Sequence, residues 1–270
     1  MARKLSNELF EKFKGNGEYV NILKEVNKDK DLSLEIREGK AIVYYKKGKI
    51  LTLSSKKIER LSSGYYKDKD GEFKFSDAQI KQNPAKYFAK AKSFVDAHGN
   101  KKEFTFQQLI ASDNLSIDND YLVVDMEYQY KQSNIPKPER LPLTRIDLLA
   151  VEKDSKDIIL FELKQGVNAL NGESGIDDHI NKMNELVKDK RFREVLIKEI
   201  KNIIEQKVEL QILPEGAKTW INEIGNSVTI RPMFIFIYSD EKEREEYDEK
   251  LRNRIPTIYL NPKYILKKPE

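Results

Sequence analysis

The stretch from residue 145 to residue 166 constrains the fold of this chain most strongly, because it sets charged residues inside apolar runs. It reads RIDLLAVEKDSKDIILFELKQG. Two of its segments, 145–151 and 158–164, are rich in Ile, Leu, Val and Phe, as strands buried on both faces are. The polar segment 152–157 between them has the composition of a tight turn. The pattern therefore predicts two adjacent strands joined by a turn.

Three charged residues, Asp147, Glu162 and Lys164, lie within these two predicted strands. Side chains alternate along a strand, so Glu162 and Lys164 point to the same face. A buried charge requires a partner or a metal ion. Carboxylates on neighbouring strands can bind a hard divalent cation, and a lysine beside it can position a water for attack on phosphate. The alternative is an edge hairpin whose charges face water, although a solvated strand face usually carries more polar residues.

Asp147 followed by Glu162-Leu163-Lys164 on adjacent strands resembles the PD-(D/E)xK nuclease superfamily, also called restriction-endonuclease-like. The Pro-Asp dipeptide of the family name is absent, since Ile146 precedes Asp147. The resemblance implies that Asp147 and Glu162 bind Mg²⁺ or Mn²⁺, joined by the backbone carbonyl of Leu163. It also implies that Lys164 orients or activates the attacking water.

Members of this superfamily usually add an acidic residue upstream of the aspartate. The segment 121–130 reads as a good strand, and Glu127 within it is the first choice for this role, as a catalytic residue and metal ligand. Asp125 is the second choice and Asp120 the third. The other interpretation of Glu127 is a surface glutamate on an edge strand.

The absence of cysteine restricts the kinds of metal site that the chain can build. It excludes disulfides, thiolate zinc sites and cysteine-held iron–sulfur clusters. The only histidines are His98 and His179, so a metal must be held mainly by carboxylates, which favours Mg²⁺ or Mn²⁺. The sequence predicts His98 at a helix end. His179 falls in the first turns of a predicted helix. The sequence leaves open whether His179 lies near the metal, contacts a phosphate or has no functional role.

A formal net charge of +4 permits nucleic-acid binding without requiring it. Lys131, Lys137, Arg140 and Arg145 form a basic run near the proposed site, which suits a phosphate backbone. The alternative is a solvated loop. The tyrosine- and lysine-rich segment 44–47 suits single-stranded nucleic acid, but tyrosines are also common in strands.

The order of the predicted elements divides the chain into a β-rich N-terminal elaboration, 1–75, and a nuclease-like core, 76–270. Glycines 39 and 48 separate short strands at 32–36, 41–45 and 50–53 in the first part. The pattern of the second part predicts, in chain order, a helix at 84–97, strands at 121–130, 145–151 and 158–164, helices within 175–206, a strand at 231–238, a helix at 240–252 and a strand at 257–260. The fold class expected is mixed α/β, and the order resembles the αβββαβ core of the restriction-endonuclease-like fold, a mixed sheet flanked by helices.

The function expected from this resemblance is a metal-dependent nuclease that hydrolyses phosphodiester bonds, with DNA as the expected partner. The alternative is a catalytically silent nuclease-like module that binds nucleic acid or a protein. A third hypothesis, an α/β enzyme acting on small molecules, lacks a G-x-S-x-G or dinucleotide motif. No apolar run is long enough for a membrane span or a signal peptide, so the expected location is the cytoplasm without a membrane partner. The sequence leaves open whether the protein forms a homodimer that cuts both DNA strands.

Overall fold

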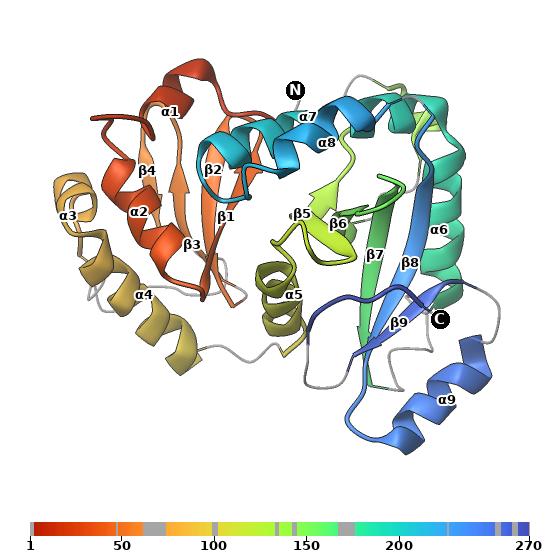
Figure 1. Cartoon of the computed structure of the whole chain (residues 1–270). Coiled ribbons are helices and arrows are strands. Elements are labelled where there is room, and N and C mark those ends of the chain that lie inside the picture. The colour runs from red at the N-terminus through yellow and green to blue at the C-terminus, as the bar shows by residue number, and fades with distance from the viewer. Residues whose placement is uncertain are drawn as a thin grey trace.

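The computed structural model shows two α/β units side by side, each built on one β-sheet (Figure 1). It describes residues 3–46, 48–61, 74–98, 102–132, 135–141, 145–166, 176–225, 227–251, 255–260 and 264–269. Over these residues the two sheets have four and five strands. Helices flank both sheets, which confirms the expected mixed α/β class.

The N-terminal sheet is an antiparallel meander in which each strand pairs with the next along the chain. Its strands are β1 (Leu32–Arg37), β2 (Lys40–Tyr45), β3 (Gly48–Leu53) and β4 (Ile58–Arg60). The β1–β2 turn requires positive φ angles, 40° at Glu38 and 75° at Gly39, and glycine adopts such a conformation without steric cost. The three strands predicted here are confirmed, and the short β4 was not predicted.

Four helices of this unit contribute to a single apolar core on one face of the N-terminal sheet. They are α1 (Asn7–Glu11), α2 (Val20–Lys28), α3 (Asp77–Gln82) and α4 (Pro84–His98). Leu9, Ile22 and Tyr87 from these helices belong to one buried cluster with Val43 and Leu51 from the strands. Because α3 and α4 pack here, the packing extends the N-terminal unit to about His98, beyond the boundary predicted at residue 75. Residue 98 ends α4, as the sequence predicted.

The second sheet combines an antiparallel half and a parallel half. Its strands, which are also neighbours in this order, are β5 (Tyr121–Gln129), β6 (Arg145–Glu152), β7 (Ile158–Gln165), β8 (Ile230–Ile237) and β9 (Thr257–Leu260). The first three pair antiparallel, whereas β8 pairs parallel to β7 and β9 pairs parallel to β8. Every strand that the sequence predicted in this region is present.

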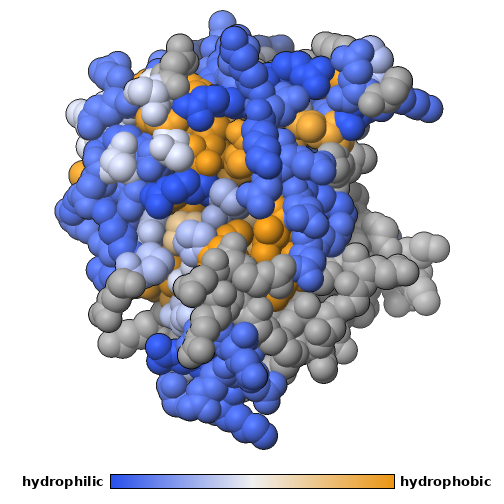
Figure 2. All heavy atoms as spheres, turned by 90° about the vertical axis from the view of Figure 1, so that its right-hand side faces the viewer, coloured by the Kyte–Doolittle hydropathy of each residue, from blue (hydrophilic) through white to orange (hydrophobic). Residues whose placement is uncertain are grey.

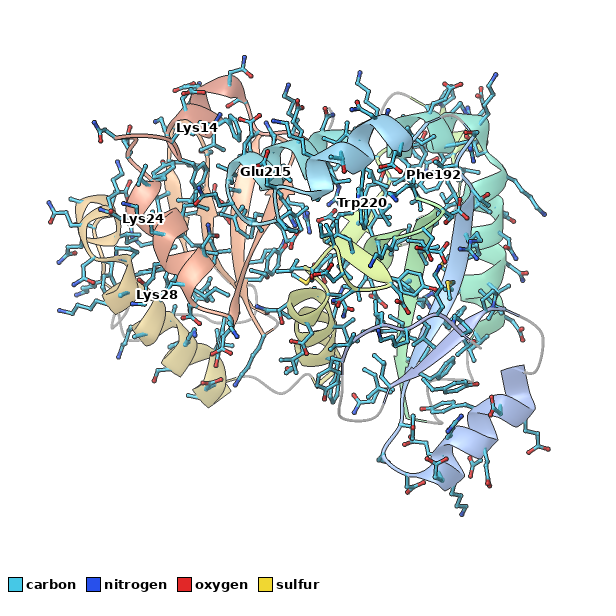
Figure 3. The ribbon with its side chains drawn as sticks, in the orientation of Figure 1. Lys14, Lys24, Lys28, Phe192, Glu215 and Trp220 are labelled. Carbon is cyan, nitrogen blue, oxygen red and sulfur yellow. The ribbon has the colours of Figure 1, made fainter. Side chains whose placement is uncertain are left out.

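Helices cover both faces of the second sheet. They are α5 (Lys102–Asp113), α6 (Ile176–Lys188), α7 (Lys190–Glu209), α8 (Ala217–Glu223) and α9 (Glu241–Leu251), with a 3₁₀ turn, η1 (Lys137–Glu139). Phe192 of α7 and Trp220 of α8 point toward one face (Figure 3) and pack with Leu160 of β7. On the other face, Ile110 of α5 packs with Phe161 of β7. The helix that opens the core is therefore α5 and not α4, which the sequence had placed in that position.

Buried ion pairs join the two units. The guanidinium groups of Arg3 and Arg37 both contact the carboxylate of Asp125 on β5. Nearby, Lys207 Nζ of α7 lies 2.8 Å from Glu35 Oε2 of β1. All of these side chains except that of Arg37 are less than one-tenth exposed. The units are therefore held together by buried charges as well as by apolar contact.

Helix α7 runs across the top of both sheets (Figure 1). Its buried apolar side chains from Phe192 to Val208 pack on the second sheet, whereas Leu210, just after its end, belongs to the apolar core of the N-terminal unit. Gln206 Oε1 accepts a hydrogen bond of 2.8 Å from the backbone N–H of Leu5. Glu199 Oε1 accepts another, of 3.1 Å, from the backbone N–H of Arg3. One helix thus fixes the N-terminal segment against both units.

The face that carries α6 and α9 is largely hydrophilic, with apolar atoms visible in the hollows between polar side chains (Figure 2). Within the described part of the chain, no helix has the length and apolar character needed to cross a membrane.

Candidate functional site

Strand β7 places Glu162 and Lys164 on the same face, as the alternation of side chains predicted. Lys164 Nζ lies 3.0 Å from Glu162 Oε1, and the two side chains are 9% and 5% exposed. Leu160, two residues before Glu162, belongs to the apolar cluster beneath α7, whereas Leu163 belongs to the cluster on the opposite face. The two charges are therefore a buried pair, and the alternative of a solvated edge hairpin is wrong.

A second cation-forming side chain approaches the same carboxylate. His179, in the first turn of α6, has its Nδ1 atom 2.9 Å from Glu162 Oε1. This contact between Nδ1 of His179 and Oε1 of Glu162 does not have the geometry of a hydrogen bond. Nδ1 of His179 and Oε2 of Glu162 are both buried without a hydrogen-bond partner among the described residues. One oxygen of Glu162 thus keeps its full capacity to accept a ligand.

Asp147 on β6 is tied to the same segment of β7. Its Oδ2 atom accepts a hydrogen bond of 2.8 Å from the backbone N–H of Leu163, the residue between Glu162 and Lys164. Its own backbone carbonyl accepts a hydrogen bond from the side chain of Gln107 on α5. The structure therefore brings together Asp147, Glu162, Leu163 and Lys164, which the sequence had predicted from two separate strands.

Strand β5 is irregular where it faces Asp147. Met126 pairs with Leu148 and Tyr128 pairs with Ile146, so Glu127 lies opposite Asp147. Glu127 has a φ angle of 49°, a left-handed conformation that costs a residue with a side chain about 1 kcal/mol or more. Such strain is concentrated at functional sites and in ligand clamps.

The side chain of Glu127 pairs with Arg145, whose Nη1 atom lies 3.3 Å from Glu127 Oε1. Glu127 does not join Asp147 and Glu162 in a group of three, because no three acidic or histidine side chains gather closely enough to hold a metal ion in the described ranges. The role predicted for Glu127 as upstream acid stays a prediction.

The other two candidate acids lie in different surroundings. Burial alone would raise the pKa of Asp125, but the charges of Arg3 and Arg37 outweigh it and hold that pKa at about 2. Asp125 therefore serves the junction between the units. Asp120, just before β5, accepts a hydrogen bond of 3.0 Å from the backbone N–H of Lys268 at the opposite end of the strand from Glu127.

Of the four residues in the predicted basic run, Lys131 and Arg145 line a cleft of about 320 Å³ between the N-terminal sheet and the β5–β6 pair. Lys137 and Arg140 are exposed at η1, where Arg140 Nε donates a hydrogen bond of 2.7 Å to the carbonyl of Ile135. Neither of them lines this cleft.

The sequence had not assigned Arg3, Arg37, Lys40 and Lys49, which line the same cleft, to any site. They come from four separate segments, so no local motif marks them. The only sequence signal is that Arg37 and Lys40 flank a predicted hairpin turn.

The residues present fit a carboxylate-bound Mg²⁺ or Mn²⁺ ion. Mg²⁺ keeps several of its waters and is held in many sites by one or two carboxylates, so Asp147 and Glu162 provide a sufficient protein donor set. The buried, unpartnered Oε2 of Glu162 is the structural observation that supports this fit. Lys164 and His179 approach the other oxygen of Glu162, Oε1.

Comparison with known proteins returned no match: no family model matches the chain, and neither a curated protein nor a solved structure is significantly similar to it.

Proposed function

We propose that this protein is a metal-dependent nuclease that hydrolyses phosphodiester bonds in DNA. The observation that carries the proposal is the hydrogen bond from the backbone of Leu163 to the carboxylate of Asp147. It fixes the aspartate of one strand beside the Glu162-Leu163-Lys164 segment of the next, as the resemblance to the PD-(D/E)xK superfamily requires.

The topology of the second sheet gives independent support for a restriction-endonuclease-like core. Helix α5 is followed by the antiparallel strands β5, β6 and β7, then by the helices α6, α7 and α8, and then by β8, which is parallel to β7. This is the αβββαβ order that the resemblance implies, with α5 as its first helix.

The roles proposed for the residues follow from their charges and positions. Asp147 and Glu162 would hold Mg²⁺ or Mn²⁺, with the carbonyl of Leu163 as a further oxygen donor. The ion would supply Lewis acidity to the phosphate. Lys164 would orient the attacking water and stabilise the negative charge that develops on the phosphate oxygens, because an ammonium group held in a buried site is already oriented toward that charge.

The imidazole of His179 would lie beside the proposed ligand, with its Nδ1 atom 2.9 Å from Glu162 Oε1. His179 lies in the first turn of α6, next to Ile180 and Met183, which pack on Phe234 of β8. The helix that crosses from β7 to β8 therefore also brings a side chain to the proposed site.

A cleavage assay tests the proposal. Supercoiled plasmid and single-stranded circular DNA would be incubated with Mg²⁺, Mn²⁺ or EDTA, with the wild-type protein and with Lys164→Ala. The matched control is Lys182→Ala, which removes a partly exposed lysine of α6 paired with Asp178 at 2.6 Å. We expect metal-dependent cleavage by the wild type and the control and a loss of about 100- to 1,000-fold in Lys164→Ala. Equal cleavage by the two lysine variants would contradict the proposal.

The alternative is a nuclease-like module that binds without cutting. It is favoured by the pairing of Glu162 with Lys164 and by the absence of a three-ligand group among the described residues. Calorimetric titration with Mg²⁺ and Mn²⁺ separates the two functions. Binding that disappears in Asp147→Asn supports the nuclease, whereas no binding by the wild type supports the module.

A further inference from the structure

The cleft between the two units collects positive charge. Six basic side chains line it, and they come from both units: Arg3, Arg37, Lys40, Lys49, Lys131 and Arg145. Only two carboxylates, those of Glu38 and Glu127, line it with them. The excess of four positive charges equals the formal net charge of the whole chain, so this surface carries far more than an even share of that charge.

The basic residues of the cleft differ in how far they are neutralised. Lys131 pairs with Glu38 at 2.5 Å, and Arg145 pairs with Glu127 at 3.3 Å. Arg37 and Arg3 both contact the buried carboxylate of Asp125. These pairs hold the walls of the cleft in place.

Lys40 and Lys49 make no ion pair within the described residues. Lys40 contributes to lowering the pKa of Glu59, but the larger cause is the hydrogen bond from Lys57, which lies 2.5 Å from Glu59. These two ammonium groups are therefore available to a ligand.

The floor of the cleft is rigid. Ile42 and Tyr44 line it, and both belong to the buried cluster that joins β2 to Met126 of β5 and Ile110 of α5. Tyr44 pairs with Lys49 across the β2–β3 ladder. Burial raises the pKa of Tyr44 to about 12, so its hydroxyl stays neutral. The lysines thus extend from a packed sheet surface and not from a loop.

The cleft reaches the strand ends that carry the candidate site. Arg145, which lines it, begins β6 two residues before Asp147. Glu127, which also lines it, lies opposite Asp147 on β5. Because β7 is antiparallel to β6, the carboxyl end of β7, with Glu162 and Lys164, lies at this same end of the sheet.

We propose that this cleft binds the phosphate backbone of the DNA strand that enters the candidate site. The inference deepens the proposed function and rests on it for the identity of the substrate. The basic groups are spread over the N-terminal segment and strands of both units, which suits a row of phosphates along a chain. A single free anion would be held by groups that converge on one point. A charge-based contact of this kind positions the strand without reading its sequence.

Binding in EDTA tests the cleft without cleavage. Fluorescence anisotropy would measure the affinity of the wild type for a labelled 20-nucleotide DNA strand and its duplex, at several salt concentrations. The test variant is Lys40→Ala/Lys49→Ala. The matched control is Lys24→Ala/Lys28→Ala, which removes two exposed lysines along α2 on the N-terminal unit (Figure 3). Thermal unfolding of both variants would show that they are folded.

We expect the cleft variant to lose at least about fivefold in affinity at moderate salt, and the slope of log affinity against log salt to become shallower by about 1.4 to 1.8. The control should match the wild type. Equal losses in the two variants, or no loss in either, would overturn the proposal. Displacement of the DNA by millimolar inorganic phosphate, with affinity independent of oligonucleotide length, would overturn it in favour of a free-anion site.

The binding assay can contradict the proposed cleft without contradicting the proposed nuclease activity, and the cleavage assay can do the reverse. Cleavage lost in Lys164→Ala with DNA affinity unchanged would support both proposals. DNA binding that depends on Lys40 and Lys49, in a protein that does not cleave DNA, would support the binding cleft and contradict the proposed nuclease activity.

Discussion

Two buried groups of charges in this protein are built in opposite ways. At the junction between the units, both oxygens of Asp125 are engaged by arginines, Oδ2 by Arg3 and Oδ1 by Arg37. At the candidate site, Lys164 and His179 both approach Glu162 at Oε1, and Oε2 has no hydrogen-bond partner in the described structure. A buried carboxylate that serves stability is satisfied at both oxygens, whereas one that serves a ligand keeps an oxygen free.

The largest expected effect concerns the junction. Asp125→Asn keeps the side-chain volume but leaves Arg3 and Arg37 without their counter-charge. Breaking a buried pair in this way costs about 3 to 5 kcal/mol of unfolding free energy. Urea denaturation measures the loss. The control is Glu127→Gln, whose partner Arg145 is largely exposed, and its cost should stay below about 1 kcal/mol. Similar losses in both would remove the distinction between junction and site.

The second prediction concerns the buried pair of the candidate site. Glu162→Gln and Lys164→Met each remove one charge and leave the other buried, so each should destabilise the protein. Together they remove both charges, and the double variant should be more stable than either single variant, by about 1 to 3 kcal/mol. Denaturation of all four proteins completes the cycle. If the protein is the proposed nuclease, the double variant should also lack cleavage. Additive stability losses would show that the two charges do not interact.

A smaller effect is expected from the metal ion. If Asp147 and Glu162 bind Mg²⁺, a free concentration of about ten times the dissociation constant adds about 1.4 kcal/mol to the unfolding free energy. Thermal unfolding with MgCl₂ and with EDTA measures this gain. Asp147→Asn should abolish it, whereas Asp125→Asn should retain it, because Asp125 belongs to the junction. A gain that survives in Asp147→Asn would place the metal elsewhere.

The last expected effect is a pH dependence of the junction. Burial raises the pKa of Glu35 to about 7, against the opposing charge of Lys207. The folded protein then keeps a proton that the unfolded chain releases near 4.5, so this contribution to stability is complete below about pH 4.5 and is lost as the pH rises through 7. We expect the melting temperature to fall by a few degrees between pH 5 and pH 8, and Glu35→Gln to flatten that fall. Parallel curves for the two proteins would assign the dependence to other groups.

Much of the fold was predictable because its signals are local. The apolar runs of β6, β7 and β8 are dictated by burial on both faces, and the alternation of side chains put Glu162 and Lys164 together. The helix α4 was also predicted, because its start has a local signal. In the structure, Asn83 caps its first turn by accepting a hydrogen bond of 3.1 Å from the backbone N–H of Lys86. Which sheet α4 covers was not predictable, because an apolar stripe does not specify its partner.

The acids of β5 show where local reasoning fails. The alternation rule gives Asp125 and Glu127 the same face. The register of β5 shifts between Val123 and Asp125, and Glu127 adopts a left-handed φ, so the rule does not hold across this segment. The partner of Asp125, Arg3, is 122 residues away in the chain. Contacts at such separation leave no periodic signal in the sequence.

The path of α7 across both units has a consequence for the minimal length of a folded fragment. Removing residues 1–75 would take away Glu35, the buried partner of Lys207 at 2.8 Å, and the segment around Leu5 that binds Gln206. It would also uncover Leu210, which packs among the removed strands. The core that carries Asp147 and Glu162 cannot be trimmed to a stable domain at that boundary, so the N-terminal unit acts as an internal scaffold for the site.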